Sequence, residues 1–317
     1  TKMKNLRITL ISCLLAIALT GSLMAQSYEF KVMAAKGKAT VKKANSKSWA
    51  KIKLGTQLSK KDMVKLTGKS YVSLVHKSGK TVELKKAGSF SIAELSKSVR
   101  GNKSSVSKRF ADYLMDEISS SEDLLAAGEH RDKMGTTGSV ERSMNTQPFV
   151  NKDALQLNSP RKVNFLNTTF TFRWNEFEQS KDYEFVLADR FDKPVVTKNV
   201  SGTMVTLNAD ELKLDKDTYY FWSVRVKGKE KQKSDDACFL ILSDDKVKAI
   251  QDTVELIKSE FDDPNTASAK IILAAYYEQN HIVDEALKAY QEAKTLAPDV
   301  EIYDRLYQRF LSRTNIS

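Results

Sequence analysis

The chain has 317 residues, of which 41% are hydrophobic and 29% are charged, and its formal net charge is +11. This length exceeds that of a usual single domain, so we expect several domains in series. The composition is that of ordinary globular proteins, and it excludes a disordered, a collagenous or a disulfide-stapled chain.

The positive charge is concentrated in one part of the chain. Residues 26–108 hold 20 Lys and Arg against four acids, whereas 109–243 and 244–317 each carry more acids than bases. A surface of one sign attracts polyanions in general, such as lipid headgroups, anionic glycans, nucleic acids or acidic proteins. We therefore expect a single basic domain near the N-terminus.

Residues 1–25 have the pattern of a secretory signal peptide. Basic residues precede an apolar run at 8–19, and small residues lead to Ala25. The run is shorter than the roughly 20 residues that a membrane-spanning helix needs. The pattern predicts an exported, periplasmic protein. A lipoprotein anchored at Cys13, or another outer-membrane-associated form, is less favoured because it would leave an apolar run of only about five residues.

Residues 26–96 alternate apolar and polar residues in short runs, as closely spaced antiparallel strands do. Gly37, Trp49, the segment GTQLSKKDMVKLTG at 55–68 and the segment YVSLVHKSGKTVEL at 71–84 carry a more specific pattern. They resemble the FecR-like periplasmic domain, which implies an all-β fold. The sigma-factor role of FecR is not implied, because neither its cytoplasmic segment nor its membrane span fits before the expected start of the mature chain.

Residues 97–151 change character and become rich in serine. Phe110, Leu114 and Ile118 recur at helical spacing, which predicts one helix over about 105–127. No apolar period follows, so we expect a flexible, exposed linker after the helix.

Residues 152–243 return to alternating strands, two of which carry Trp174 and Trp222. About 90 residues of this kind, with turns between the strands, predict a β-sandwich. The run from Leu214 through Tyr219 to Trp222 resembles the late strand of fibronectin type III domains. The resemblance implies a fibronectin III/Ig-like fold in which Tyr219 forms a tyrosine corner.

Residues 244–317 switch to a helical period. The segment 267–300 resembles a tetratricopeptide repeat. The positions that carry the repeat's packing are Leu273, Ala274, Tyr277, Ala286, Tyr290, Ala293 and Pro298. Such repeats present a groove for a peptide or helix, so Lys270 and Ala275 of the first helix are expected to face outward toward a partner. The fold class is then multidomain: an all-β FecR-like domain, a β-sandwich and α-helical tetratricopeptide-like repeats.

No catalytic, cofactor-binding or metal-binding residues are expected, and the chain is predicted not to be an enzyme. His76, His130 and His281 fall in three different regions, too dispersed to share a nucleophile or a zinc ion. Cys238 lies in a buried-strand pattern and is expected to be a packed, inert thiol.

Three lysine pairs in the basic domain are candidates for binding polyanions. They are Lys42, Lys43, Lys60, Lys61, Lys85 and Lys86. Lysines on the outer face of a sheet also keep edge strands from pairing, which is an ordinary structural role. The functional alternative is a face for an anionic glycan, lipid or acidic protein. Nucleic acid is not expected, because the chain is predicted to be exported and shows no aromatic stacking motif.

These expectations combine into an exported, non-enzymatic scaffold or binding protein of the cell envelope. Its partners would be an envelope protein or peptide at the repeat helices and an anionic glycan or lipid at the basic domain. The alternative is a periplasmic signalling or regulatory protein of FecR type, linked to a TonB-dependent receptor system. A third class, an enzyme or enzyme subunit, has no visible site.

Overall fold

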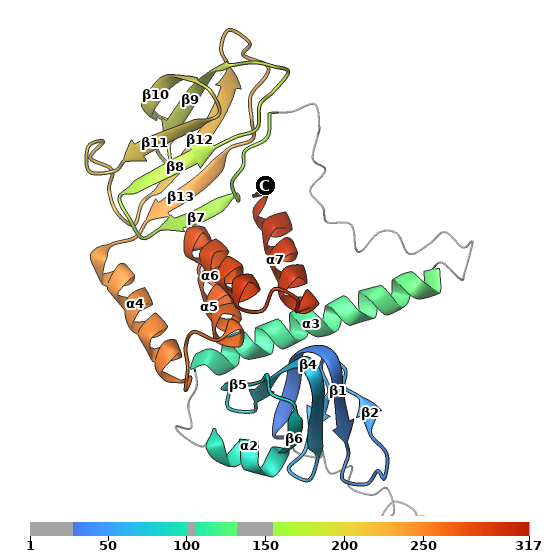
Figure 1. Cartoon of the computed structure of the whole chain (residues 1–317). Helices are drawn as coiled ribbons and strands as arrows, with labels where there is room; N and C mark the ends of the chain where they lie inside the picture. Colours follow the sequence, from blue (N-terminus) through green and yellow to red (C-terminus); the bar gives the residue numbers. More distant parts are fainter. Residues whose placement is uncertain (1–27, 100–105, 132–154, 317) are drawn as a thin grey trace, which may run out of the picture.

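The computed structural model describes residues 28–99, 106–131 and 155–316 (Figure 1). The predicted signal peptide at 1–25, with Cys13, and the part of the expected linker at 132–151 lie outside the described residues. Within the described part, no helix is long and apolar enough to cross a membrane. The chain forms an N-terminal β domain, a long helix, a β-sandwich and a C-terminal region of four helices.

The N-terminal domain is a six-stranded antiparallel sheet followed by a short helix. Its elements are β1 (Phe30–Lys42), β2 (Ala50–Lys51), β3 (Gln57–Leu58), β4 (Met63–His76), β5 (Thr81–Leu84), β6 (Gly88–Ser91) and α2 (Ile92–Ser98). The long strands β1 and β4 pair with each other, and the short strands pair with them at the edges. Ile92 and Val99 are buried in the core of this domain, which therefore extends past the expected boundary at residue 96.

The second half of β4 is buried on both faces. Val72 and Leu74 belong to the hydrophobic core of the N-terminal domain, whereas Tyr71 and Val75 belong to a second core shared with the helices. Alternate residues of a strand point to opposite faces of the sheet. The strand therefore lies between two cores, as its nearly continuous apolar sequence indicates.

Helix α3 (Val106–Arg131) runs between the N-terminal sheet and the C-terminal helices (Figure 1). The C-terminal helices are α4 (Asp244–Ser259), α5 (Ala267–Gln279), α6 (Val283–Leu296) and α7 (Glu301–Thr314). Helix α5 has the sequence ASAKIILAAYYEQ. Nine of its 13 residues are buried, among them Ala267, Ile271 and Ala275, and they point to several sides of the helix. A helix that is apolar on all sides has to be covered on all sides. Helices α3, α4 and α6 and strand β5 supply that cover.

The middle domain is a β-sandwich. One sheet has the strand order β10-β9-β12-β13-β7, and a two-stranded sheet pairs β11 with β8. The strands are β7 (Lys162–Phe165), β8 (Thr169–Arg173), β9 (Asp182–Ala188), β10 (Pro194–Ser201), β11 (Met204–Asn208), β12 (Tyr219–Val226) and β13 (Ala237–Ile241). Phe172 of the small sheet packs on Trp222 and Phe239 of the large one, with ring centroids 4.6 and 5.3 Å apart. Aromatic packing of this kind closes the sandwich.

Tyr220, and not the expected Tyr219, is the tyrosine that faces into the sandwich at the start of β12. Tyr219 is 40% exposed, whereas Tyr220 is 5% exposed and its hydroxyl accepts a hydrogen bond from the backbone N–H of Asp215 at 2.8 Å. The assignment to Tyr219 was wrong because side chains alternate along β12, so Tyr220 shares the inward face with Trp222.

The sandwich and the C-terminal helices meet at the turn between α5 and α6. Asn164 of β7 donates from its backbone N–H to the carbonyl oxygen of His281 and from Nδ2 to that of Asn280, both at 2.8 Å. Asn315, just after α7, donates to the carbonyl oxygen of Leu157 at 2.6 Å. These backbone contacts, together with a continuous hydrophobic core, join the two regions.

Strand β1 bends at Gly37, where its register against β4 shifts. Gly37 has a φ of +77°, and a Cβ there would lie 2.8 Å from the carbonyl oxygen of Lys69 and 2.8 Å from Oγ of Ser70. Gly68 also has a positive φ, of +62°, but a Cβ there would meet nothing within 4 Å. An alanine at either position would strain the backbone, but only an alanine at Gly37 would also clash with neighbouring atoms. Comparing the two substitutions therefore distinguishes the two effects.

Gly37→Ala should lower the free energy of unfolding by about 2–4 kcal/mol, because it adds a steric clash to a strained backbone. Gly68→Ala is the matched control and should cost only about 1 kcal/mol. Urea unfolding of the full chain measures both values. Equal losses in the two variants would contradict the close approach at Gly37.

Candidate functional site

The acids of the N-terminal domain lie inside it and its lysines lie outside. Residues 28–99 contain only the four acids Glu29, Asp62, Glu83 and Glu94. The side chains of the first three are at most 5% exposed, and only Glu94 is exposed. Five of the 17 lysines in this range form ion pairs, so twelve form none with the described residues. The outer surface is therefore more basic than the composition alone indicates.

Glu29 is a buried carboxylate that neighbouring donors hold in its ionised form. It accepts hydrogen bonds from Nζ of Lys77 at 2.8 Å and from Oγ of Ser96 at 2.6 Å, and Nζ of Lys60 lies 3.8 Å away. Burial by itself would raise the pKa of Glu29, but these hydrogen bonds and the two lysine charges lower it to about 2. The ionised carboxylate ties the start of β1 to the β4–β5 hairpin and to α2.

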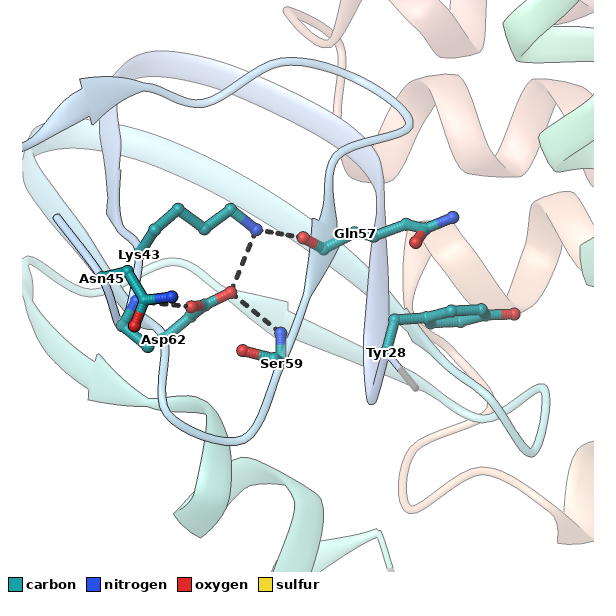
Figure 2. A pocket seen from close by; sticks show the side chains of 7 residues that line it. Tyr28, Lys43, Asn45, Gln57, Ser59 and Asp62 are labelled. Atoms are coloured by element: carbon teal, nitrogen blue, oxygen red, sulfur yellow. Dashed lines mark hydrogen bonds and ion pairs between the residues drawn. The ribbon is translucent and has the colours of Figure 1, made fainter. Parts of the chain in front are cut away.

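Asp62 has the same role in a polar pocket of about 310 Å³ that Tyr28 also lines (Figure 2). It accepts hydrogen bonds from Nζ of Lys43 at 3.0 Å and from the backbone N–H groups of Ala44 and Ser59 at 3.0 and 2.9 Å. Burial opposes ionisation, but these donors lower the pKa of Asp62. Lys43 also donates to the carbonyl oxygen of Gln57. The charges of Lys43 and Asp62 neutralise each other. Their hydrogen bonds join the loop after β1 to the loop between β3 and β4.

Glu83 joins the N-terminal domain to the C-terminal helices. Its Oε1 accepts hydrogen bonds from the hydroxyl of Tyr71 at 2.7 Å and from the backbone N–H and Oγ of Ser268 at 2.8 and 2.5 Å. The Tyr71 hydroxyl also lies 2.9 Å from that of Tyr303 in α7, and Lys85 pairs with Oε2 of Glu83 at 2.7 Å. Burial opposes ionisation of Glu83, but the donors lower its pKa, while burial raises the pKa of Tyr71. The result is a buried polar network at a domain junction.

The six lysines predicted to bind polyanions do not share one environment. Lys43, Lys60 and Lys85 are paired with Asp62, Glu29 and Glu83 respectively. Lys42, Lys61 and Lys86 form no ion pair with any described residue. Lys85 and Lys86 line a hollow of about 450 Å³ together with Asp262 and Asp263, so acids face that pair. The structure therefore does not bring the six together into one site.

A second basic group, which the sequence analysis did not single out, surrounds Trp49. Trp49, Lys38, Lys51 and Lys65 line an open hollow of about 540 Å³ on the outer face of the sheet. Trp49 is 38% exposed, and Nζ of Lys65 lies 5.8 Å from the centroid of its ring. The period-two alternation of β1 and β4 predicts which lysines point outward, but only the strand register shows which of them are neighbours.

Five of the seven residues predicted to pack the repeat are buried in the C-terminal core. Leu273, Ala274, Ala286, Tyr290 and Ala293 are at most 4% exposed. Tyr277 is half-buried, and Pro298 lies exposed in the connection between α6 and α7. Tyr290 also donates a hydrogen bond from its hydroxyl to Glu278 at 2.7 Å.

The outward face predicted for the first repeat helix is covered. Ala275 is fully buried, in the same core as Phe110 and Leu114 of α3, and Lys270 pairs with Glu292 at 2.7 Å. The expectation that Ala275 faces a partner was therefore wrong, because α3 of the same chain packs against α5. The apolar circumference of α5 is the sequence signal that could have shown this.

Helix α3 is held on α5 and α7 by both apolar and charged contacts. Phe110 packs edge-on against Tyr276 of α5, with ring centroids 5.2 Å apart. Glu117 of α3 pairs with Arg309 and Arg313 of α7 at 3.1 and 2.9 Å.

The first turn of α3 is capped from the C-terminal region. The carboxylate of Glu260 accepts hydrogen bonds from the backbone N–H groups of Val106 and Ser107 at 2.9 and 3.0 Å. A carboxylate at a helix N-terminus satisfies free N–H groups and complements the helix dipole. The start of α3 is thus tied to the end of α4.

His76 ends strand β4, Cys238 lies in β13, and His281 lies in the turn between α5 and α6. His76 is buried and its Nδ1 lies 2.8 Å from Oγ of Ser78, while His281 is in the α5–α6 turn with a φ of +57°. Burial lowers the pKa of both histidines and raises the pKa of the half-buried Cys238 thiol. The side chain of His130 lies outside the described residues. Among the residues that are described, no group of three or more His, Cys, Asp and Glu could hold a metal ion.

Comparisons with known proteins add little to this description. No family model matches the chain, and no curated protein matches it. A crystal structure described as that of a Fn3-like protein from Clostridium thermocellum matches 29% of this chain and 95% of its own, with 17% identity and a TM-score of 0.22. At this identity and TM-score the likeness carries no argument about function.

Glu29→Gln should lower the free energy of unfolding by about 1–3 kcal/mol at pH 7, because it removes a carboxylate that two side chains bind. The folded pKa of about 2 is below the ordinary value of 4.5, so the carboxylate stabilises the fold above pH 4.5 and loses this effect as pH falls toward 2. Unfolding of both proteins at pH 7, 4 and 2.5 should therefore show a shrinking difference. The exposed Glu94→Gln is the control, and a difference independent of pH would contradict the assignment.

Glu83→Ala should destabilise the chain by about 2–3 kcal/mol, because it leaves buried donors of Tyr71 and Ser268 unpaired. Hydrogen exchange should rise at the backbone N–H of Ser268, where the domains meet. Glu94→Ala, on the exposed face of α2, should change stability by less than about 0.5 kcal/mol. Equal behaviour of the two variants in urea unfolding and exchange would show that the junction does not depend on Glu83.

Proposed function

We propose that this protein is an exported, non-enzymatic scaffold or binding protein of the cell envelope, whose N-terminal domain binds anionic polymers. The observation that carries the proposal is the separation of charge in that domain. Three of its four acids are buried and neutralised, while twelve lysines form no ion pair with the described residues. Such a surface attracts anionic glycans, lipids or acidic proteins without requiring a catalytic group.

The family assignments are part of this proposal. The motifs at 55–68 and 71–84 support a FecR-like N-terminal domain, and the arrangement of the two sheets supports a fibronectin III-like spacer. The small residues Ala274, Ala286 and Ala293 between α5 and α6 support a tetratricopeptide-like repeat.

A protein partner at the repeat helices would use surface that α3 does not cover. Leu256 of α4 and Leu296 of α6 are 48% and 45% exposed, and both lie on this region. An envelope protein or peptide at these helices is the second kind of partner that we propose, whereas α3 already fills the face over α5 and α7.

The full chain should bind inorganic polyphosphate at low salt and lose affinity steeply between 50 and 500 mM NaCl, because exposed charges are screened. Isothermal titration calorimetry measures this, with neutral dextran as the polymer that should not bind. Lys61→Ser combined with Lys86→Ser should weaken binding, whereas Lys181→Ser combined with Lys198→Ser, the same charge change on the sandwich, should have less effect. Absence of binding at 50 mM NaCl would contradict the proposal that the exposed lysines bind anionic polymers.

A further inference from the structure

The hollow around Trp49 has a defined arrangement of side chains. Thr40 of β1 lies opposite Lys51 of β2 and opposite Lys65 of β4, so these three form one row across the sheet. Lys38 lies opposite Thr67, two residues along β1, and forms the next row on the same face. Neighbouring strands are about 4.8 Å apart, which places the Cα atoms of Lys51 and Lys65 about 10 Å from each other.

No acid of the N-terminal domain stands among these lysines. Its buried acids lie elsewhere, and Ala39, Val41, Val64 and Leu66 between the lysine positions point into the core. Lys38, Lys51 and Lys65 are exposed and form no ion pair with the described residues. The hollow therefore combines three uncompensated positive charges with one exposed aromatic face.

This combination suits a ring that has both an apolar face and a negative charge. The C–H groups on one side of a pyranose ring can pack on the electron-rich face of an indole, while a carboxylate on the same ring reaches a lysine. An open hollow admits a chain of such rings from either side. A membrane surface is less suitable, because it would require apolar groups that protrude rather than line a hollow.

Single-stranded nucleic acid fits the same face less well. Proteins that bind it use several aromatic platforms and arginine, and residues 28–99 contain no arginine. The hollow offers one tryptophan only, with lysine as its single kind of cation. Lysine ammonium groups provide point charges without a planar fork for bases.

We propose that the hollow lined by Trp49, Lys38, Lys51 and Lys65 binds an acidic polysaccharide, with a sugar ring on the indole and its carboxylates on the lysines. This inference rests on the proposed function and adds to it a site and a ligand class. It assigns a binding role to Trp49 and to three lysines that lie outside the six predicted from the sequence.

The test is a titration of the full chain with polygalacturonate. Trp174 and Trp222 are 3% and 2% exposed, so emission that iodide can quench belongs to Trp49. Bound polysaccharide should shield that emission from iodide, and dextran should not. Inorganic polyphosphate, which has charge but no sugar ring, and oligo-dT are titrated in parallel by calorimetry.

Trp49→Ala should weaken binding of polygalacturonate about tenfold, equivalent to about 1.4 kcal/mol, and should leave the affinity for polyphosphate within about twofold. Trp49→Phe keeps an aromatic face and should retain most of the affinity. Lys51→Ser combined with Lys65→Ser should weaken both polymers, whereas Lys181→Ser combined with Lys198→Ser should leave both within about twofold. Far-UV circular dichroism verifies that each variant is folded.

Three outcomes would overturn the inference. If the wild-type chain binds polyphosphate and polygalacturonate, and folded Trp49 variants bind both unchanged, the site is wrong while the proposed function stands. If the wild-type chain binds no anionic polymer, both fail. If oligo-dT binds more tightly than polygalacturonate and depends on Trp49, the ligand is a nucleic acid. Should Trp49→Ala fail to fold, Trp49→Phe and the lysine variant decide between the same outcomes.

Discussion

Helix α5 is buried around most of its circumference, and the arrangement of the domains depends on covering it. Exposing such a helix to water would cost about 25 cal/mol for each Å² of apolar surface. A single partner helix covers one side, as α6 does here, and the other sides need further elements. Helix α3, helix α4 and the edge strand β5 provide them. The N-terminal domain therefore meets the C-terminal helices although they are far apart in the sequence.

This arrangement changes what a short helical array needs for stability. Helical repeats bury their apolar faces against neighbouring repeats, and about three repeats are usually needed. The four C-terminal helices pack against α3 and the second half of β4, with Tyr71 and Val75 contributing to the same core as Tyr303 of α7. Contacts within the chain thus stabilise these helices.

In the N-terminal domain, three of the four acids are buried and most lysines are exposed. A buried carboxylate has to be paired or hydrogen-bonded, so each of Glu29, Asp62 and Glu83 is surrounded by donors. These acids hold loops and a domain junction together from within. Because these acids bind donors inside the domain, Lys38, Lys51 and Lys65 form no ion pair with the described residues, and the surface around Trp49 is positive. Stability and the proposed binding role thus have one physical origin.

Local periodicity along the chain determined the main elements of this protein. The apolar runs at 63–66 and 71–75 predict strands, which the structure joins into the single strand β4. The spacing of Phe110, Leu114 and Ile118 predicts helix α3, and small residues at Ala274 and Ala286 predict a close helix pair. Tertiary structure alone decided which tyrosine faces inward at the end of the sandwich, which lysines are paired, that Ala275 is buried, and that Lys38, Lys51 and Lys65 lie around Trp49. The physical reason is that periodicity depends on residues a few positions apart, whereas the pairing of charges and the covering of faces depend on strand register and on packing between segments as far apart as Tyr71 and Tyr303.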